Sequence, residues 1–186
     1  NRGRYTFSNS TGYPAIFACP GGSVTLNDVT ATSTEAVLSV SNSTVVVNGG
    51  NFSTTGTKSC FVNSYANLTI NKGTTTEGTF ASEGASCIQN SWGRVEINGG
   101  TITSDADCTI KNRGSLRMNG GTVATSNAEG TVIDCTGNFG DTWINGGTIK
   151  GGKDGILLKD LGSSGVTLKQ ATFEDNTQSN IHLGAG

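Results

Sequence analysis

Residues 95–102 have the sequence VEINGGTI, and related octets recur along the chain. Val95 and Ile97 alternate with Glu96, which is the period-two pattern of a strand with one inward face. The Asn-Gly-Gly that follows favours a tight corner, because Asn and Gly accept the positive φ angles that corners require. A Thr-Ile pair then begins a new strand, so the octet predicts two strands joined by a sharp bend.

The Asn corner repeats at an uneven period of 21 to 27 residues. A repeat of this length, without the 3.6-residue apolar spacing of helices, predicts the coils of a β-solenoid. The position is Lys169 in the last copy, and in the earlier copies it is Asn27, Asn48, Asn71, Asn98, Asn119 and Asn145.

A third apolar segment precedes each corner by roughly 11 to 13 residues and completes the coil. The chain is therefore predicted to be all-β, a right-handed parallel β-helix of about seven to eight three-strand coils, each rising about 4.8 Å. Residues 15–186 are expected to form this single domain. Residues 1–14 are expected to be an N-terminal segment that acts as a cap or as a partner-binding strand.

The composition agrees with a thin structure that has a narrow core. Of the 186 residues, 33% are hydrophobic, 14% are charged and 28 are glycine, which is less apolar and less charged than a compact globule. The net charge of −2 and the scattered Lys and Arg residues argue against a nucleic-acid partner. No apolar run is long enough to insert into a membrane.

The repeated coil, with Asn at the corner between its second and third strands, resembles the right-handed parallel β-helix superfamily. That superfamily includes pectate-lyase-like enzymes, phage tailspikes and bacterial surface adhesins. The resemblance covers residues 15–183 and is closest in style to the solenoids of adhesins and phage fibres, although Lys169 departs from the corner pattern. It implies the fold, and it leaves the function to be argued from sites.

Two polar columns are expected on the outside of the coils. The corner asparagines would hydrogen-bond between coils and satisfy turn backbone, which is a structural role. An outward threonine face would be formed by Thr30, Thr74, Thr101, Thr122, Thr148 and Thr172. A regular face of this kind resembles ice-binding solenoids, but threonine is also a good strand residue.

An apolar stripe beside the first-strand column predicts a partner surface. Neighbouring strand residues face opposite sides, so one of two adjacent apolar columns should face outward, covered by the N-terminal segment or by another chain. The column expected outside is Phe17, Leu38, Phe61, Ile88, Ile133 and Leu157. The inward column includes three cysteines expected to be buried free thiols, Cys60, Cys87 and Cys108.

The titratable residues do not form a recognisable catalytic or metal site. The best group is Asp107 and Asp134 with Lys111 and Lys159, and it lacks the paired carboxylates of glycoside hydrolysis. The single histidine, His182, has no convergent ligands. We therefore expect no catalytic residues, no metal, no cofactor and no enzymatic activity.

The expected function is structural, in an extracellular fibre, filament or adhesin at a cell surface or on a virion. The chain begins at Asn1 without an initiator Met, which suggests a processed or excised segment. Bare coil ends would favour self-association, either end to end or lateral. The alternatives are a carbohydrate-active enzyme (polysaccharide lyase or glycoside hydrolase) and an ice- or glycan-binding solenoid; for a cell-surface glycan, Trp143 is the expected contact.

Overall fold

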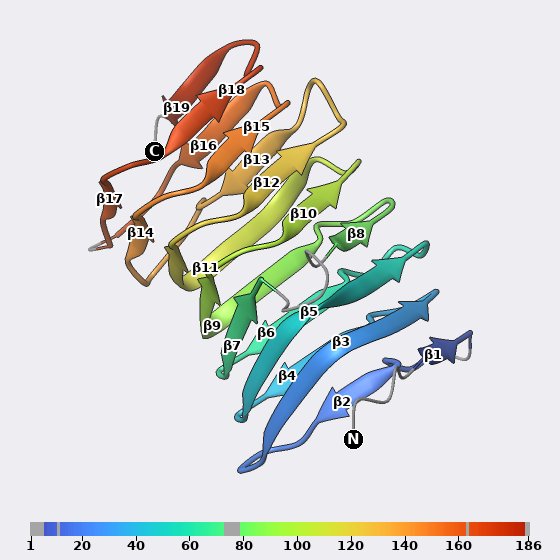
Figure 1. Cartoon of the computed structure of the whole chain (residues 1–186). Helices are drawn as coiled ribbons and strands as arrows, with labels where there is room; N and C mark the ends of the chain where they lie inside the picture. Colours follow the sequence, from blue (N-terminus) through green and yellow to red (C-terminus); the bar gives the residue numbers. More distant parts are fainter. Residues whose placement is uncertain (1–5, 11, 73–78, 163, 185–186) are drawn as a thin grey trace.

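The computed structural model describes residues 6–10, 12–72, 79–162 and 164–184, and these form a parallel β-solenoid of about seven turns (Figure 1). All regular elements among the described residues are strands, and every strand pairing is parallel. The first coil lies at the bottom of Figure 1 and the last at the top. The predicted fold class is therefore confirmed.

Three columns of strands make up the three faces of the solenoid. The first face contains β2 (Ile16–Ala18), β4 (Leu38–Ser41), β6 (Phe61–Ser64), the starts of β9 (Ile88–Ile97) and β11 (Cys108–Met118), β13 (Thr131–Asp134), β16 (Asp154–Leu158) and β19 (Ser179–Leu183). The second contains the starts of β3 (Ser23–Ser33) and β5 (Thr44–Thr54), β7 (Asn67–Asn71), the ends of β9 and β11, β14 (Thr142–Ile144) and β17 (Val166–Leu168). The third contains β1 (Thr6–Asn9), the ends of β3 and β5, β8 (Thr79–Ser82), β10 (Thr101–Ser104), β12 (Thr122–Thr125), β15 (Thr148–Lys150) and β18 (Thr172–Glu174).

The corner between the second and third faces requires glycine. Gly50 has a φ of 102°, and a Cβ there would lie 2.6 Å from the backbone nitrogen of Val29 in the coil below. Gly121 has a φ of 83° and lies directly on the corner formed by Gly99 and Gly100. The glycines of the repeated Asn-Gly-Gly sequence therefore have two roles: they allow the turn, and they let the next coil stack closely on the corner.

The core is a single narrow stack of inward side chains. On the first face, one column contains Ile16, Leu38, Phe61, Ile88, Ile110, Ile133, Ile156 and Ile181. The largest fully buried side chains are Phe52, Phe61 and Phe80 in the second and third coils, with ring centroids 5.4 to 5.5 Å apart.

The expectation of an outward apolar stripe is wrong for most of its members. Leu38, Phe61, Ile88 and Ile133 have no exposed surface, and their neighbours Val37, Cys60, Cys87 and Val132 have none either. Both columns face inward because the chain bends where the first strand begins. The amides of Val37 and Leu38 both donate to the carbonyl of Cys60 at that bend.

Two members of the stripe do belong to an outward column. Phe17 is 57% exposed and pairs with Ser39, and Leu157 is half-buried between Asp134 and His182. This column is mostly polar, so it forms no continuous apolar surface.

The register of the third coil also differs from expectation. Thr79 pairs with Asn51 and Thr101, so it takes the column position predicted for Thr74, and Phe80 occupies the inward position next to it. Thr74 itself lies outside the described residues. The long interval between Asn71 and Asn98 contains the extra residues that displace the pairing.

The cysteine column is shorter than predicted. Thr109, not Cys108, is level with Cys87, because Ile110 pairs with Ile88; Cys108 instead places its sulfur 3.0 Å from the Ser86 hydroxyl. All five cysteines are free thiols. Burial, together with the adjacent Cys87, raises the pKa of Cys60 well above its usual value, and burial raises the pKa of Cys135 to about 11. The thiols of Cys60 and Cys135 are therefore protonated and poorly reactive at neutral pH.

Replacing Phe80 should reveal how far the ring stack supports the fold. We expect Phe80→Ala to reduce the free energy of unfolding by about 3–5 kcal/mol, because it leaves a cavity beside the rings of Phe52 and Phe61. The control is Phe17→Ala, which removes an exposed ring of the same size and should change stability by about 0.5 kcal/mol or less. Equal losses in denaturant titrations of the two variants would contradict the register described for Phe80.

Candidate functional site

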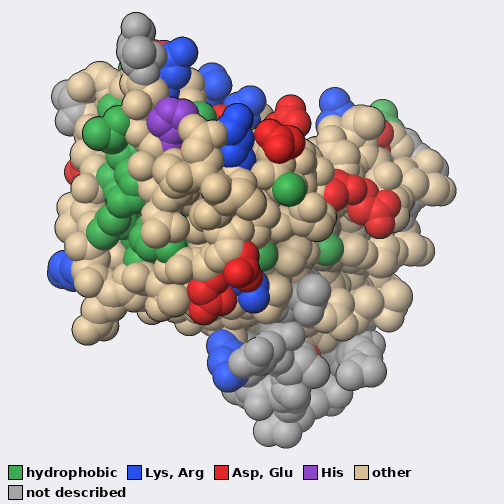
Figure 2. All heavy atoms as spheres, turned by 90° about the horizontal axis from the view of Figure 1, so that it is seen from above, with side chains coloured by type: hydrophobic (Ala, Val, Ile, Leu, Met, Phe, Trp, Pro, Cys, Tyr) green, Lys and Arg blue, Asp and Glu red, His purple; other side chains and the backbone are tan. Residues whose placement is uncertain are grey.

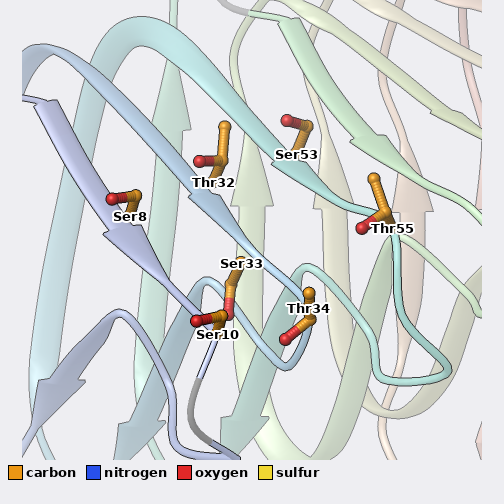
Figure 3. A pocket seen from close by; sticks show the side chains of 7 residues that line it. All are labelled: Ser8, Ser10, Thr32, Ser33, Thr34, Ser53 and Thr55. Atoms are coloured by element: carbon orange, nitrogen blue, oxygen red, sulfur yellow. The ribbon is translucent and has the colours of Figure 1, made fainter.

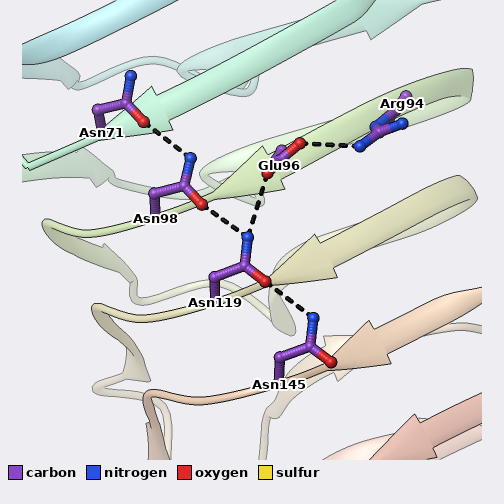
Figure 4. Close-up of polar contacts among 6 residues, drawn as sticks. All are labelled: Asn71, Arg94, Glu96, Asn98, Asn119 and Asn145. Carbon is purple, nitrogen blue, oxygen red and sulfur yellow. Dashed lines mark hydrogen bonds and ion pairs between the residues drawn. The ribbon is translucent and has the colours of Figure 1, made fainter.

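The corner asparagines form one continuous hydrogen-bonded ladder from Asn27 to Asn145. Figure 4 shows the part of this ladder from Asn71 to Asn145. Each Nδ2 donates to the Oδ1 of the preceding asparagine over 2.7 to 2.8 Å. Glu96 joins the ladder by accepting from Asn119 over 3.1 Å, and its other oxygen pairs with Arg94 at 2.9 Å. Amides bonded to one another in this way stabilise the corner and present little free capacity to a ligand.

The threonine column lies on the outside of the third face. Thr30, Thr101, Thr122 and Thr148 are half-buried and Thr172 is exposed, while Asn51 interrupts the column. The parallel column two residues on contains Ala124, and then Lys150 and Glu174, whose charged atoms are 3.9 Å apart. The predicted threonine face is therefore not accompanied by a second column of hydroxyl groups in the C-terminal coils.

A shallow depression of about 360 Å³, lined by hydroxyl groups, lies where the third-face strands β1, β3 and β5 end (Figure 3). Its lining consists of Ser8, Ser10, Thr32, Ser33, Thr34, Ser53 and Thr55. Hydroxyl groups can donate and accept hydrogen bonds, but none of these residues is a general acid, a general base or a group that would activate a nucleophile. The depression is thus suited to binding and not to catalysis.

A second asparagine ladder lies inside the solenoid, where sequence reasoning did not look for one. Asn63 donates to Asn90 Oδ1 over 2.9 Å, Asn90 donates to Asn112 Oδ1 over 2.7 Å, and Asn112 donates to Thr142 Oγ1 over 3.1 Å. All four side chains are buried. At the start of the ladder, Asn63 Oδ1 has no partner among the described atoms, because the coil below has Val40 at that level.

The inner ladder holds the corner between the first and second faces. Asn63 Nδ2 also reaches the carbonyls of Ala66 and Arg94, at 3.1 and 3.2 Å. Asn90 Nδ2 reaches those of Gly93 and Ser115, both at 3.2 Å. The signal in the sequence is a second repeat, Asn-Ser-aromatic-small, at residues 63–66 and 90–93, which the more conspicuous Asn-Gly-Gly repeat overshadows.

Trp143 is half-buried on the outside of the second face, with the Arg117 guanidinium 5.2 Å from its ring centroid. One aromatic face is therefore engaged by a cation. Farther along the same face, a groove of about 320 Å³ is lined by Thr44, Asn67, Leu68, Thr69, Arg94 and Glu96.

The acidic and basic residues considered for catalysis do not converge. Lys111 and Asp134 are register partners, yet Asp134 Oδ1 accepts from the amide of Thr136 at 2.8 Å. No ion pair joins these two residues to Asp107 in the part of the chain that the structure describes. Within the same residues, no three His, Cys, Asp or Glu side chains are grouped so as to hold a metal ion.

A polar cluster closes the interior near the last coil. Asp154 is 5% exposed; its carboxylate accepts from the Ser179 hydroxyl and contacts His182 Nδ1 at 2.9 Å. Burial raises the pKa of Asp154, but the hydrogen bonds from Ser179 and His182 and the charges of His182 and Lys153 outweigh it, so the net pKa is lowered. Ser179 bonds to the carboxylate and not to the imidazole, so the cluster lacks the arrangement of a nucleophilic triad.

Comparisons with known proteins assign no family: no family model, no curated protein and no solved structure matches this chain. The described residues include no helix able to cross a membrane.

The inner ladder should matter more to stability than the outer one. Asn90→Leu removes an amide that hydrogen-bonds to four groups, those of Asn63, Gly93, Asn112 and Ser115, and we expect it to cost about 3 kcal/mol. Asn119→Leu removes an exposed rung, whose partners can turn to water, and should cost about 1 kcal/mol or less. Chemical denaturation of both variants checks this order, and a larger loss for Asn119→Leu would show that the outer ladder dominates.

Asp154 should give the last coil a stability that depends on pH. Its lowered pKa means that the folded state favours the carboxylate, so its contribution is present above the unfolded value of about 3.9 and is lost as pH falls through the folded pKa. Thermal melts from neutral to acidic pH should show the difference between wild type and Asp154→Asn shrinking in acid. The exposed Asp107→Asn variant should track the wild type, and the idea fails if the Asp154 difference does not change with pH.

Proposed function

We propose that this chain is a non-enzymatic structural β-solenoid of an extracellular fibre, filament or adhesin at a cell surface or on a virion, and that its copies stack end to end. The observation that carries the proposal is the match between the two open ends of the solenoid. The hydroxyl-only depression and the scattered carboxylates support a structural role over a catalytic one.

The last coil exposes side chains that would be core residues in any other coil. Ile181 and Leu183 are 39% and 76% exposed, and both occupy inward columns. Figure 2 looks down on this end, where hydrophobic side chains gather beside His182. Exposed apolar side chains next to unpaired strand edges are a typical surface for association with another chain.

The first coil offers the corresponding surface at the opposite end. Phe7 of β1 is 39% exposed and Ile16 of β2 is half-buried. Phe7 belongs to the column that ends at Phe173, and Ile16 belongs to the column that ends at Ile181. The free edges of β18 and β19 thus carry side chains that match those of β1 and β2 on the same two faces.

A second copy placed on the last coil would continue both columns without a change of register. The edge of β18 would pair with β1 of the next copy and β19 with β2, which stacks Phe173 on Phe7 and Ile181 on Ile16. Such a head-to-tail contact does not close on itself, so it produces a filament. With eight strands in the first-face column, the axial repeat would be about 38 Å.

Lateral association is not part of the proposal. The apolar stripe on which it depended is mostly inside the solenoid, since Leu38, Phe61, Ile88 and Ile133 are fully buried.

Filament formation is tested with the 186-residue chain over a concentration series, by light scattering and negative-stain microscopy. We expect filaments with an axial repeat of about 38 Å. Leu183→Lys should abolish them, because it puts a charge where a core residue of the next copy would pack. Its matched control is Thr103→Lys, a new charge on the side of a central coil, which should leave assembly intact.

The proposal fails if the wild-type chain stays monomeric at every concentration. That outcome would leave a further coil of a longer chain as the natural cover of the exposed end. It also fails if Leu183→Lys assembles as readily as the wild type.

A further inference from the structure

Three aromatic side chains from three different coils gather on the outside of the corner between the first and second faces. Tyr65, Trp92 and Phe139 are 63%, 51% and 64% exposed. The ring centroids of Tyr65 and Trp92 are 6.4 Å apart and their planes differ by 8°. Those of Trp92 and Phe139 are 4.6 Å apart with planes at 21°, so the three rings form one aligned row.

This aromatic row is costly for the backbone. Tyr65 and Trp92 have φ angles of 50° and 61°, in the left-handed region that bulky residues avoid. The second coil has the small polar Asn42 at the same corner, with a φ of 45°. A corner that served folding alone would carry Asn or Gly in every coil, and strained residues of this kind are typical of functional positions.

The row is held rigidly from inside. Each aromatic residue is followed by a small one whose carbonyl is bonded by an asparagine: Ala66 by Asn63, Gly93 by Asn90 and Gly140 by Asn138, at 3.1, 3.2 and 2.6 Å. The buried amides therefore fix the backbone beneath the exposed rings.

Close packing of glycines brings Phe139 to Trp92. Phe139 is in the sixth coil and Trp92 in the fourth, and the fifth coil has the buried Gly114 between them. A Cβ on Gly140 would lie 2.6 Å from the carbonyl carbon of Gly114, which shows how tightly the two coils meet there. The missing side chain at Gly114 leaves the outer surface open for Phe139 to pack on Trp92.

The polar groove of the second face begins beside the row. Asn67 follows Tyr65 by two residues and Arg94 follows Trp92 by two, and both line the groove of about 320 Å³. The Arg94 charge is balanced by Glu96 at 2.9 Å, so the groove offers guanidinium, carboxylate, amide and hydroxyl groups with little net charge.

We propose that the aromatic row and this groove together form a binding site for a neutral glycan made of pyranose sugars. A pyranose ring has an apolar C–H face that packs on an aromatic ring and a rim of hydroxyls that pair with planar polar side chains. No other described ring covers the outer face of Tyr65 or of Phe139, and more than half of each side chain is open to solvent. An open row of this kind suits an extended polysaccharide better than a small enclosed ligand.

A glycan fits the site better than a protein partner does. Stable protein interfaces bury about 800 Å² on each side around a desolvated apolar centre. Here the three rings lie at a corner beside a shallow groove that is lined mostly by polar residues. The site differs from the one expected at Trp143, where Arg117 covers one ring face.

The test is native affinity electrophoresis of the whole chain in gels containing a soluble β-glucan, α-glucan, mannan or galactan, with polygalacturonate as an anionic comparison. We expect at least one neutral polysaccharide to retard the protein. Trp92→Asn should weaken that binding about tenfold or more, because losing an aromatic contact worth about 1.4 kcal/mol lowers the affinity tenfold. The melting temperature of this variant should stay the same or rise, since Asn relieves the strained φ.

A matched control uses the other tryptophan. Trp143→Phe should bind like the wild type, and it leaves Trp92 as the single tryptophan of the chain. The fluorescence of this variant should shift to shorter wavelength with the retarding polysaccharide. Phe139→Ala, which removes the neighbouring ring without touching a strained residue, should also weaken binding.

Two outcomes would overturn the proposal: no retardation by any neutral polysaccharide, whether or not polygalacturonate retards the protein, or binding that survives Trp92→Asn. In the last case, a lower melting temperature for the variant would identify the row as a stack that serves stability only. The site lies on a corner of central coils, so its failure would leave end-to-end stacking untouched, and Leu183→Lys should still bind the polysaccharide.

Discussion

Backbone hydrogen bonding between successive coils is the constraint on which the rest of the molecule depends. Each strand pairs in parallel with the strand of the same face one coil away, so equivalent residues stack about 4.8 Å apart. Because the core is narrow, an inward side chain packs chiefly on its counterparts above and below. Columns of similar side chains follow, as in the run of Ile88, Ile110, Ile133 and Ile156, and one misfit residue affects two coils at once.

The same constraint explains why buried polarity takes the form of asparagine. An amide has a donor and an acceptor, so a column of asparagines one coil apart satisfies itself, as both ladders do. The inner ladder ends at Thr142, whose hydroxyl accepts the last hydrogen bond. At its other end, Asn63 Oδ1 has no hydrogen-bond partner among the described atoms. A polar column inside the solenoid therefore fixes the register of the coils and anchors the corner carrying the aromatic row.

The sequence predicts the architecture well because its corners require unusual backbone angles, and these leave local signatures such as Asn48-Gly49-Gly50. It predicts the register poorly wherever the coil length changes. Thr79 takes the place expected for Thr74 because extra residues follow Asn71, and Thr109 takes that of Cys108 through a one-residue shift. The apolar stripe was misassigned because the period-two rule assumes a straight strand, whereas the chain bends between Val37 and Leu38. The aromatic row could not be deduced locally, since Phe139 reaches Trp92 across a coil that separates them.

In a solenoid, the backbone hydrogen-bonding groups of the faces are already paired between coils. The ends and the corners are therefore the places where function can reside. Within the described residues, the strands of the central coils have partners on both edges, whereas those of the first and last coils have a partner on one edge only. Side chains at the corners lie outside the packed core. The two proposals are therefore linked by geometry although each can fail alone. In a stacked fibre the aromatic row would recur once per copy, about 38 Å apart along the axis. Weak glycan contacts at that spacing would add as avidity along one polysaccharide or one cell surface, without any new contact. Stacking would thus convert a single shallow site, too exposed to bind tightly, into an adhesive surface.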